Sequence, residues 1–357
     1  MIQEQFEIKV NTTKPSKIDQ VDWDNLPFGR VFSDHMLVMN YENGAWQTPV
    51  IESFDNLSMH PATSVLHYGQ TIFEGLKANL NKNNEILIFR PDMNAERFIE
   101  SCERMCMPVI SKEVFVECIQ KLVEVDRNWI PNKEGYSLYI RPFIMATDGY
   151  IGIKPSDTYK FIIFTCPVGA YYSKPVNVKI EEHYTRASEG GVGRAKTAGN
   201  YAASLYPAKL ANEQGFDQLL WTDSKTHEYF EESGTMNVMF MIDNILITPS
   251  EENDTILRGI TKKSFIELAR SKGHEVIERK VSVKEVVEAI RTNRLQDAFG
   301  IGTAATIAHI AKIGYRDEIF ELPSLESRKV SNEIKNILND IKQGKIADPF
   351  DWCLKVK

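Results

Sequence analysis

A stretch near the middle of the chain, residues 167–179, is rich in Pro, Gly, Tyr and Ser and interrupts the strand and helix patterns on either side. A chain of 357 residues is also too long for one ordinary hydrophobic core. Because domain boundaries fall in such segments, we expect two domains, residues 23–168 and 181–357, joined by a connection at residues 169–180. A polar arm, residues 1–22, precedes them.

Hydrophobic periodicity predicts α+β structure in both halves. In the first half, strands are expected before and after two helices, which begin near residues 93 and 112 and carry apolar residues three and four positions apart. Two short apolar runs, residues 72–76 and 86–89, flank a turn-rich stretch and indicate a hairpin. In the second half, strands alternate with helices that we expect at residues 200–213, 261–271, 283–293 and 325–342.

The composition is typical of a soluble globular protein, with 43% hydrophobic and 25% charged residues. A net charge of -7 argues against a nucleic acid or an anionic membrane as a partner. The five cysteines form no CxxC pair, and we expect a reduced, cytoplasmic protein without a structural metal. We see no signal-peptide pattern at the N-terminus, and no apolar run approaches the ~20 residues of a membrane span.

Lys196 is the residue with the clearest chemical potential, because it follows the glycine-rich stretch 190–193 and precedes a helix of small residues. A lysine that attacks a carbonyl carbon needs a partly desolvated amine, and a bulky cofactor needs the room that glycine leaves beside the backbone. A glycine-rich turn with an incidental lysine explains the local sequence equally well. The rest of the chain must decide between these interpretations.

Two small-residue turns could bind an anion. Residues 259–261 stand at the start of an expected helix, where free backbone N–H groups and the helix dipole attract negative charge. Residues 302–303 form a second turn with a hydroxyl group, and Arg97 could add a positive charge. Each of these is more often an ordinary helix cap or turn than a ligand site. The glycines of residues 190–193 lack the spacing of a dinucleotide-binding fingerprint.

Two pairs of polar residues could also belong to a site. Glu231 and Glu232 precede a small-residue turn, and a carboxylate beside a pyridine nitrogen would keep that nitrogen protonated and preserve an electron sink. A solvated Glu pair at a strand end is the commoner alternative. Tyr139 and Arg141 are two residues apart in an expected strand and therefore lie on one face of it. A structural Arg in an ion pair is an equally good explanation for that arrangement.

Other familiar catalytic patterns are missing from the sequence. The seven histidines show no metalloprotease spacing, and there is neither a Gly-x-Ser-x-Gly nucleophile elbow nor a Walker lysine. Metal-dependent and Ser-His hydrolase functions therefore receive little support.

Considered together, the motifs closely resemble the branched-chain amino-acid aminotransferases, which are pyridoxal-phosphate enzymes of fold type IV. Seven segments occur in family order: residues 28–36, 67–77, the Tyr139 and Arg141 strand, the Lys196 segment, the Glu232 turn, residues 258–261 and residues 302–304. One such segment is weak evidence, whereas seven in order are highly specific. The resemblance implies a two-domain α+β fold like that of D-amino-acid aminotransferase, with the Schiff-base lysine in the large domain and the cofactor at the domain interface. It also implies a homodimer.

The resemblance further implies the roles of individual residues. Lys196 would hold pyridoxal 5'-phosphate as a Schiff base and later carry the proton between the substrate Cα and the cofactor. Tyr201 would hydrogen-bond the phenolic oxygen of the cofactor, and Glu232 would pair with its ring nitrogen. The phosphate would be held by Arg97, Ile260, Thr261 and Thr303. The substrate pocket would be lined by Phe28, Tyr68, Tyr139, Arg141, Tyr171, Thr235 and Ala304, with Arg141 in the region that accepts the acidic side chain of glutamate.

The implied reaction is a ping-pong transfer of the amino group from L-leucine, L-isoleucine or L-valine to 2-oxoglutarate. A D-amino-acid or amine transaminase of the same fold is the nearest alternative, and a non-enzymatic phospholigand-binding protein is a more distant one. One departure from the family is visible, because residues 305–308 lack the CxxC pair of the mammalian relatives. We therefore expect no thiol-based redox control there and a closer likeness to bacterial relatives.

Overall fold

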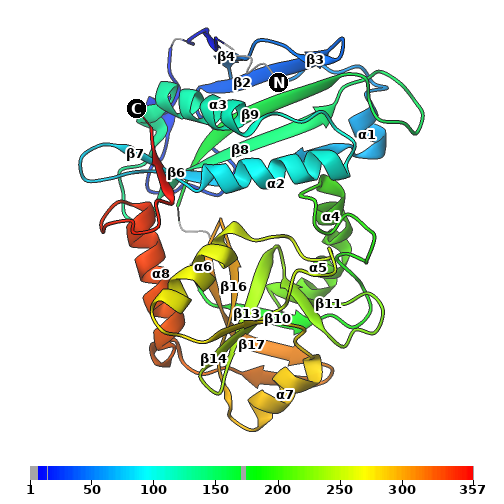
Figure 1. Ribbon diagram of the computed structural model, residues 1–357, viewed down its shortest axis with the longest axis vertical. Helices are drawn as coiled ribbons and strands as arrows, with labels where there is room; N and C mark the ends of the chain where they lie inside the picture. The colour runs from blue at the N-terminus through cyan, green and yellow to red at the C-terminus, as the bar shows by residue number, and fades with distance from the viewer. Residues whose placement is uncertain (1–6, 14, 170–173, 357) are drawn as a thin grey trace. The chain divides into compact units, whose positions relative to one another are not determined.

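The computed structural model describes residues 7–13, 15–169 and 174–356, and the chain forms two compact units (Figure 1). Unit 1 comprises Met1–Tyr171, Ala195–Ala198 and Asp340–Lys357, and unit 2 comprises Tyr172–Arg194 and Gly199–Asn339. The division differs from the expected domains, because the arm before residue 23, the segment around Lys196 and the C-terminal end all group with unit 1.

Unit 1 contains one mainly antiparallel sheet. Its described strands are β1 (Lys9–Val10), β2 (His35–Glu42), β3 (Ala45–Trp46), β4 (Val50–Ser53), β5 (Thr71–Phe73), β6 (Leu76–Leu80), β7 (Ile86–Phe89), β8 (Ser137–Ala146), β9 (Tyr159–Val168) and β19 (Cys353–Lys355). The main strand order is β1-β4-β2-β9-β8-β6-β7-β19, with β3 beside β2 and β5 beside β8. Pairing of β19 with β7 explains why the C-terminus belongs to this unit.

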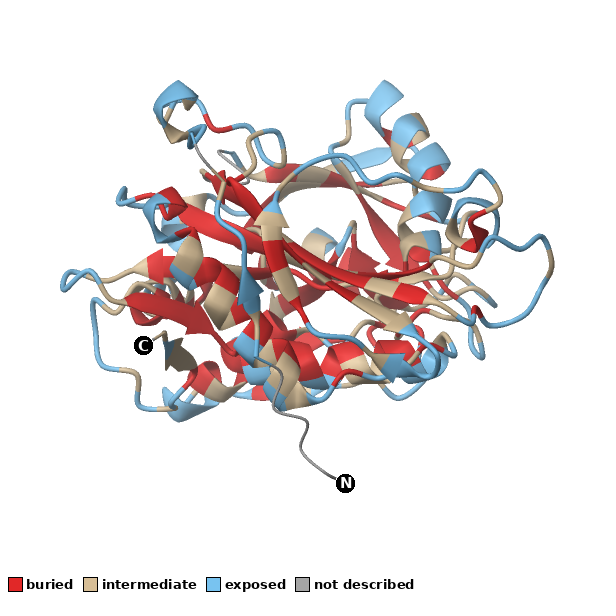
Figure 2. Cartoon of the chain, turned by 90° about the horizontal axis from the view of Figure 1, so that it is seen from above, coloured by how far each residue is buried: buried red, intermediate tan, exposed pale blue. Residues whose placement is uncertain are grey.

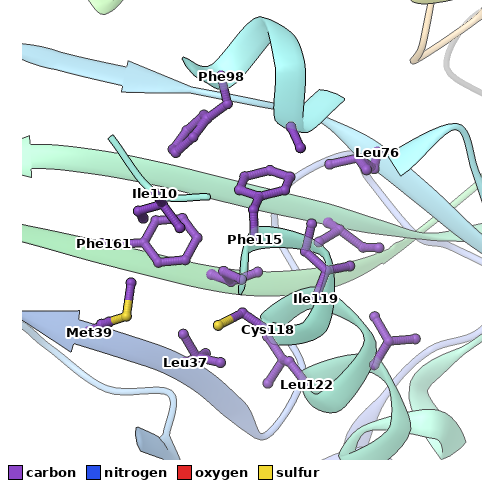
Figure 3. Close-up of a cluster of buried hydrophobic side chains, with 14 of the residues drawn as sticks. Leu37, Met39, Leu76, Phe98, Ile110, Phe115, Cys118, Ile119, Leu122 and Phe161 are labelled. Carbon is purple, nitrogen blue, oxygen red and sulfur yellow. The ribbon is translucent and has the colours of Figure 1, made fainter. Parts of the chain in front are cut away.

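The core of unit 1 lies beneath two amphipathic helices, α2 (Pro91–Arg104) and α3 (Lys112–Val125). The rings of Phe98 and Phe115 lie 4.8 Å apart, and both contact Phe161 of the sheet (Figure 3). Burial of such rings stabilises the fold by roughly 1.5–3 kcal/mol each. A short helix, α1 (Ser64–Tyr68), lies before β5 and ends at a glycine with left-handed backbone. This packing fixes α2, which carries Arg97, one of the expected site residues.

Unit 2 contains a barrel-like mixed sheet. Its described strands are β10 (Val176–Ile180), β11 (Gln218–Thr222), β12 (Phe230–Ser233), β13 (Met236–Ile242), β14 (Ile245–Thr248), β15 (Val276–Glu278), β16 (Leu295–Gly302), β17 (Thr306–Tyr315) and β18 (Glu318–Glu321). The order is β12-β11-β10-β17-β16-β13-β14-β15, and an additional pairing of β12 with β13 closes the ring. Buried residues predominate along the strands of both sheets, and exposed residues in the loops (Figure 2).

The helices of unit 2 are α4 (Ala198–Ala203), α5 (Leu205–Glu213), α6 (Ile260–Ser271), α7 (Val283–Arg291) and most of α8 (Lys329–Lys342). The expected helix over residues 200–213 is thus two helices, because the ring of Pro207 blocks a continuous turn through Ala203. Within the described ranges, none of the helices has the length and apolar character needed to cross a membrane. The α+β class predicted from the sequence is confirmed.

Candidate active site

The backbone around Lys196 is bound tightly to unit 1. The Lys196 N–H donates to Ser101 Oγ at 3.0 Å, and the Lys196 carbonyl accepts from the Phe73 N–H at 3.0 Å. The next residue, Thr197, bridges Ile72 and donates its hydroxyl to the Thr71 carbonyl at 2.8 Å. These bonds attach the segment to α2 and β5, and they are the reason that Lys196 groups with unit 1. The orientation of the lysine therefore depends on residues more than 90 positions away.

The ring of Phe73 is the centre of a cluster of side chains in unit 1. The Lys196 ammonium lies 4.8 Å from the ring centroid, and the Arg141 guanidinium lies 4.4 Å from it. Cations at these distances are attracted to the face of an aromatic ring. Sequence reasoning assigned no role to Phe73, although it lies within one of the segments that carry the family resemblance.

Tyr139 and Arg141 lie on one face of β8, as their spacing predicted. Arg141 donates to Tyr139 Oη at 2.8 Å, and Phe28 packs edge-on against the tyrosine ring at 5.1 Å. A Cβ atom on Gly75 would lie only 2.2 Å from Tyr139 Oη, so the glycine leaves room for the hydroxyl. Arg141 Nε is buried and has no hydrogen-bond partner among the described residues. A buried donor of this kind favours an anionic group of a substrate at this position.

Arg97 forms a buried ion pair that the sequence did not reveal. Its guanidinium donates to both carboxylate oxygens of Glu74, at 2.7 and 2.8 Å, and Asn94 donates to the same carboxylate at 2.7 Å. Burial alone would raise the pKa of Glu74, but the charge and hydrogen bonds of Arg97 hold it below its ordinary value. The pair fixes α2 against the strand that carries Phe73. The predicted phosphate contact of Arg97 stays a prediction.

Glu232 occupies a buried position on β12 in unit 2. Its Oε1 accepts from the Leu257 N–H at 2.7 Å and lies 3.3 Å from the Arg186 guanidinium. Only 3% of Glu232 is exposed, so this charge is stabilised by specific partners rather than by water. Arg186 gave no signal in the sequence, and its role in holding the carboxylate appears only in the folded chain.

The segment just before α6 lies close to this carboxylate in space, because it contains Leu257. Asn237 pairs with Glu232 across β12 and β13, and its amide donates to the Leu257 carbonyl at 2.9 Å. A Cβ atom on Gly259 would lie 1.7 Å from Asn237 Oδ1, so only glycine fits before the helix. The helix then begins at Ile260, with Thr261 next. The first N–H groups of a helix have no partner within it, so this helix start is suited to an anion, and the predicted phosphate contacts of Ile260 and Thr261 stay predictions.

The second predicted turn follows β16. Asn237 pairs with Ile301 in the sheet, and a Cβ atom on Gly302 would lie 3.0 Å from Met236 Cγ. Thr303 and Ala304 come directly after the strand and are partly exposed, and Thr235 is exposed at the turn before β13. The structure therefore brings this turn, the Thr235 turn and the Glu232 carboxylate to one end of neighbouring strands.

The remaining predicted residues are Tyr201, Tyr68 and Tyr171. Tyr201 is partly buried on α4, five positions after Lys196. Tyr68 ends α1 with 44% exposure, and its described ring contact is with His67 rather than with the Phe73 cluster. Tyr171 lies outside the described residues. In the part of the chain that the structure describes, no group of three or more His, Cys, Asp or Glu could hold a metal ion.

Comparison with known proteins identifies the family. The sequence model described as "Amino-transferase class IV" matches residues 71–313. The chain is 43% identical to branched-chain-amino-acid aminotransferase 2 of Bacillus subtilis, over 100% of this chain and 98% of that protein. This chain belongs to the class IV aminotransferases. It is also 41% identical to a probable branched-chain-amino-acid aminotransferase of Staphylococcus epidermidis, covering 95% of each.

Solved structures of branched-chain amino acid aminotransferases show the same fold. A branched-chain amino acid aminotransferase of Escherichia coli matches with a TM-score of 0.73 at 24% identity, covering 89% of this chain and 99% of that one. The Thermobaculum terrenum enzyme, solved in its PLP-form, matches with a TM-score of 0.70 at 21% identity, covering 90% of this chain and 98% of that one. The predicted type IV fold is therefore confirmed.

Proposed function

We propose that this aminotransferase uses pyridoxal 5'-phosphate to exchange the amino group between L-leucine, L-isoleucine or L-valine and 2-oxoglutarate. One observation carries the proposal: the Lys196 amine lies against the ring of Phe73, and Arg141 lies against the same ring. An amine and a guanidinium are thus fixed on one aromatic side chain. The full-length identity to branched-chain relatives supports the same substrates and does not favour the D-amino-acid alternative.

The polar groups of the chain fit pyridoxal phosphate. The N-terminus of α6 presents N–H groups suited to a phosphate, and we assign Ile260, Thr261 and Thr303 to it. The buried Glu232 carboxylate has the charge needed to retain a proton on a pyridine nitrogen, and Tyr201 is assigned to the phenolic oxygen. When bound, pyridoxal phosphate supplies a carbonyl group that bonds to amines and a ring that stabilises negative charge at the substrate Cα.

Lys196 has the role of proton carrier in this proposal. Its amine takes the proton from the substrate Cα and returns a proton at the reacting carbon of the cofactor, and Phe73 keeps water away from one side of it. The bonds from the Lys196 backbone to Ser101 and Phe73 fix the point from which the side chain reaches. Such preorganisation is what a proton transfer over a short distance requires.

Two kinds of substrate side chain must be accepted in turn. Phe28, Phe73 and Tyr139 offer apolar ring surface to a branched side chain. The Nε of Arg141 is buried and available to the second carboxylate of glutamate or 2-oxoglutarate. We assign the common α-carboxylate to backbone donors near Ala304. The assignments of Tyr171 and Thr235 to the pocket stay predictions.

Mass spectrometry after borohydride reduction tests the function most directly. We expect a pyridoxyl adduct on Lys196 and a yellow native protein whose visible absorbance is lost in Lys196→Ala. Lys209→Ala, at an exposed lysine of α5, should keep both signals. An adduct on another lysine would overturn the assignment. Amino transfer to 2-oxoglutarate from D-alanine in preference to L-leucine would overturn the substrate class.

An exposed apolar surface on unit 1 supports a homodimer. Gln70 connects the segments after Met105 and before Ser156. Its amide nitrogen donates to the Met105 carbonyl at 2.9 Å, and its amide oxygen accepts from the Ser156 N–H at 3.2 Å. The exposed apolar side chains that we assign to this surface are Leu66, Tyr68, Val109, Tyr150, Ile151 and Ile153, and Ile153 is 96% exposed. An apolar surface of this kind marks a contact site. A dimer would also account for a role of Tyr68 in substrate binding, and a monomeric mass in sedimentation at full activity would contradict it.

We also propose a cytoplasmic location. All five cysteines are free thiols, and burial raises the pKa of Cys118 to about 12, so it stays a thiol. Free thiols are typical of a reducing compartment. Cell fractionation tests the location.

A further inference from the structure

Thr306 has an unusual backbone conformation at the start of β17. Its φ angle is 61°, which lies in the left-handed region. That region is disfavoured for side chains with a branched Cβ, and glycine, asparagine or aspartate normally occupies it. The residue is also buried, with 5% exposure. A conformation of this kind costs free energy and persists only where the surrounding structure enforces it.

Contacts with α8 and with the sheet hold Thr306 in place. Its hydroxyl donates to Oδ1 of Asn339 on α8 at 3.0 Å. In the sheet it pairs with Gly302 of β16, and the N–H of Ile307 donates to the Ala305 carbonyl at 2.8 Å. The bond to Asn339 spans 33 positions of the chain. A distant helix therefore enforces a backbone conformation that the local sequence disfavours.

The helix α8 is itself fixed to both strands of this hairpin. Asp297 of β16 accepts from Arg328, just before the helix, at 3.1 Å. On β17, His309 Nε2 lies 3.0 Å from Asn332 Oδ1. Asp297 and His309 are both buried, so these contacts are shielded from water. They make Asn339 a fixed point against which the end of the hairpin can be held.

The turn that Thr306 closes carries two residues with assigned roles. It consists of residues 303–305, between the paired Gly302 and Thr306. Under the proposed function, Thr303 binds the phosphate and backbone donors near Ala304 bind the α-carboxylate of the substrate. Both residues are partly exposed, whereas Thr306 is buried. Backbone donors bind a carboxylate more tightly when their direction is fixed before the ligand arrives.

We propose that Thr306 is a positioning residue, whose hydrogen bond to Asn339 holds the turn in a strained shape that directs the donors near Ala304 at the substrate carboxylate. This inference rests on the proposed function. Thr306 acts through the turn and does not touch the ligand. The hydroxyl bond and the packing around Thr306 offset the strain, and the fixed turn loses less conformational freedom when a carboxylate binds.

A merely space-filling role for Thr306 leads to the opposite expectations for two substitutions. Valine has nearly the shape of threonine and would fill the same volume. Under the proposal, however, Thr306→Val loses the bond that enforces the left-handed conformation and keeps the branched Cβ that opposes it. The turn should then relax. Thr306→Asn removes the branched Cβ, and because asparagine tolerates the left-handed region, the turn should keep its shape.

Binding of 4-methylpentanoate to the holoenzyme, measured by calorimetry, tests the proposal. This carboxylate is leucine without its amino group, so it can occupy the site without reacting. We expect Thr306→Val and Asn339→Ala each to raise its dissociation constant about tenfold, because hydrogen bonds to the carboxylate are weakened but not lost. Thr306→Asn should stay within about twofold of the unsubstituted protein. The double variant Thr306→Val with Asn339→Ala should also lose about tenfold, since both changes break one bond.

Asn332→Ala is the matched control, because it removes another contact between α8 and β17 without changing the turn. It should lower the Tm and leave the affinity for 4-methylpentanoate unchanged. Three outcomes would overturn the proposal: full affinity in Thr306→Val, a loss in Thr306→Asn as large as in Thr306→Val, or an equal loss in Asn332→Ala. If Thr306→Val does not fold, Asn339→Ala replaces it, and equal affinities of Asn339→Ala and Thr306→Asn refute the proposal.

Failure of the proposed function would look different. An unsubstituted protein that binds neither pyridoxal phosphate nor 4-methylpentanoate would refute the proposed function, and this inference with it. If the unsubstituted protein binds both and Thr306→Val binds 4-methylpentanoate equally well, the inference alone fails.

Discussion

Replacing Gly75 by alanine would separate recognition of the acidic substrate from recognition of the apolar one. The new Cβ would lie 2.2 Å from Tyr139 Oη, and contacts become ordinary only at 3.4 Å, so the phenol must retreat by about 1.2 Å. The hydrogen bond from Arg141 to that oxygen, now 2.8 Å long, would then be broken. A hydrogen bond that involves a charged group is worth about 1.5–3 kcal/mol, which corresponds to roughly a 10- to 100-fold change in rate.

The assay is the half-reaction with each amino acid, followed by the visible absorbance of the cofactor. We expect kcat/KM for L-glutamate to fall roughly 10- to 100-fold, because Arg141 loses its orientation. The loss for L-leucine should be smaller, because leucine makes no use of the guanidinium. Gly149→Ala is the matched control, since its Cβ would meet His60 at an ordinary 3.5 Å.

A double substitution identifies the cause of the effect. Tyr139→Phe removes the oxygen that Gly75→Ala would displace, and the nearest remaining ring atom is then Cζ at 3.0 Å. The double variant should therefore be little worse than Tyr139→Phe alone, since the two changes act on one contact. Additive losses, or equal losses for glutamate and leucine, would refute the reasoning.

Three further predictions follow from the buried groups and the exposed surface. Glu74→Gln leaves a buried arginine without its carboxylate and should lower the free energy of unfolding by about 3–5 kcal/mol in urea; Glu96→Gln, at an exposed ion pair, should lower it by less than about 1 kcal/mol. Because burial raises the pKa of Glu231 from 4.5 to about 7, the folded protein binds this proton more tightly than the unfolded chain. Stability should therefore fall by about 3 kcal/mol as pH rises through that range. Glu231→Gln should remove this slope from a plot of Tm against pH, and a slope that persists would show another origin. Ile153→Asp should convert the dimer to a monomer in sedimentation, whereas Ile319→Asp, at a 63% exposed residue of β18, should not.

Much of the fold and site could be predicted because the relevant signals are local. Helices α2, α3, α6 and α7 appear near their expected positions, since apolar residues at three- and four-residue spacing mark one buried face. The start of α6 at Ile260, directly after Gly259, likewise follows from the local sequence. Tyr139 and Arg141 share a face of β8 for the same reason, because alternation along a strand follows directly from the sequence.

Other features depended on residues far apart in the chain. Phe73 showed no special pattern, and its importance comes from Lys196 and Arg141, which reach it from separate segments. The pairing of Glu74 with Arg97 joins residues 23 positions apart and is visible only once α2 packs on the sheet. The grouping of Lys196 with unit 1 has the same origin, in bonds to β5 and α2.

The sequence alone therefore determined the α+β class, the family and the types of group available for chemistry. Those properties follow from residue type and short-range spacing, which do not change on folding. The tertiary structure decided how those groups differ. Glu231 and Glu232 are chemically identical neighbours, yet Glu232 has Leu257 and Arg186 as partners while an oxygen of Glu231 is buried without a donor among the described residues. Burial and long-range hydrogen bonding set that difference, because the local environment of a carboxylate exists only in the folded chain.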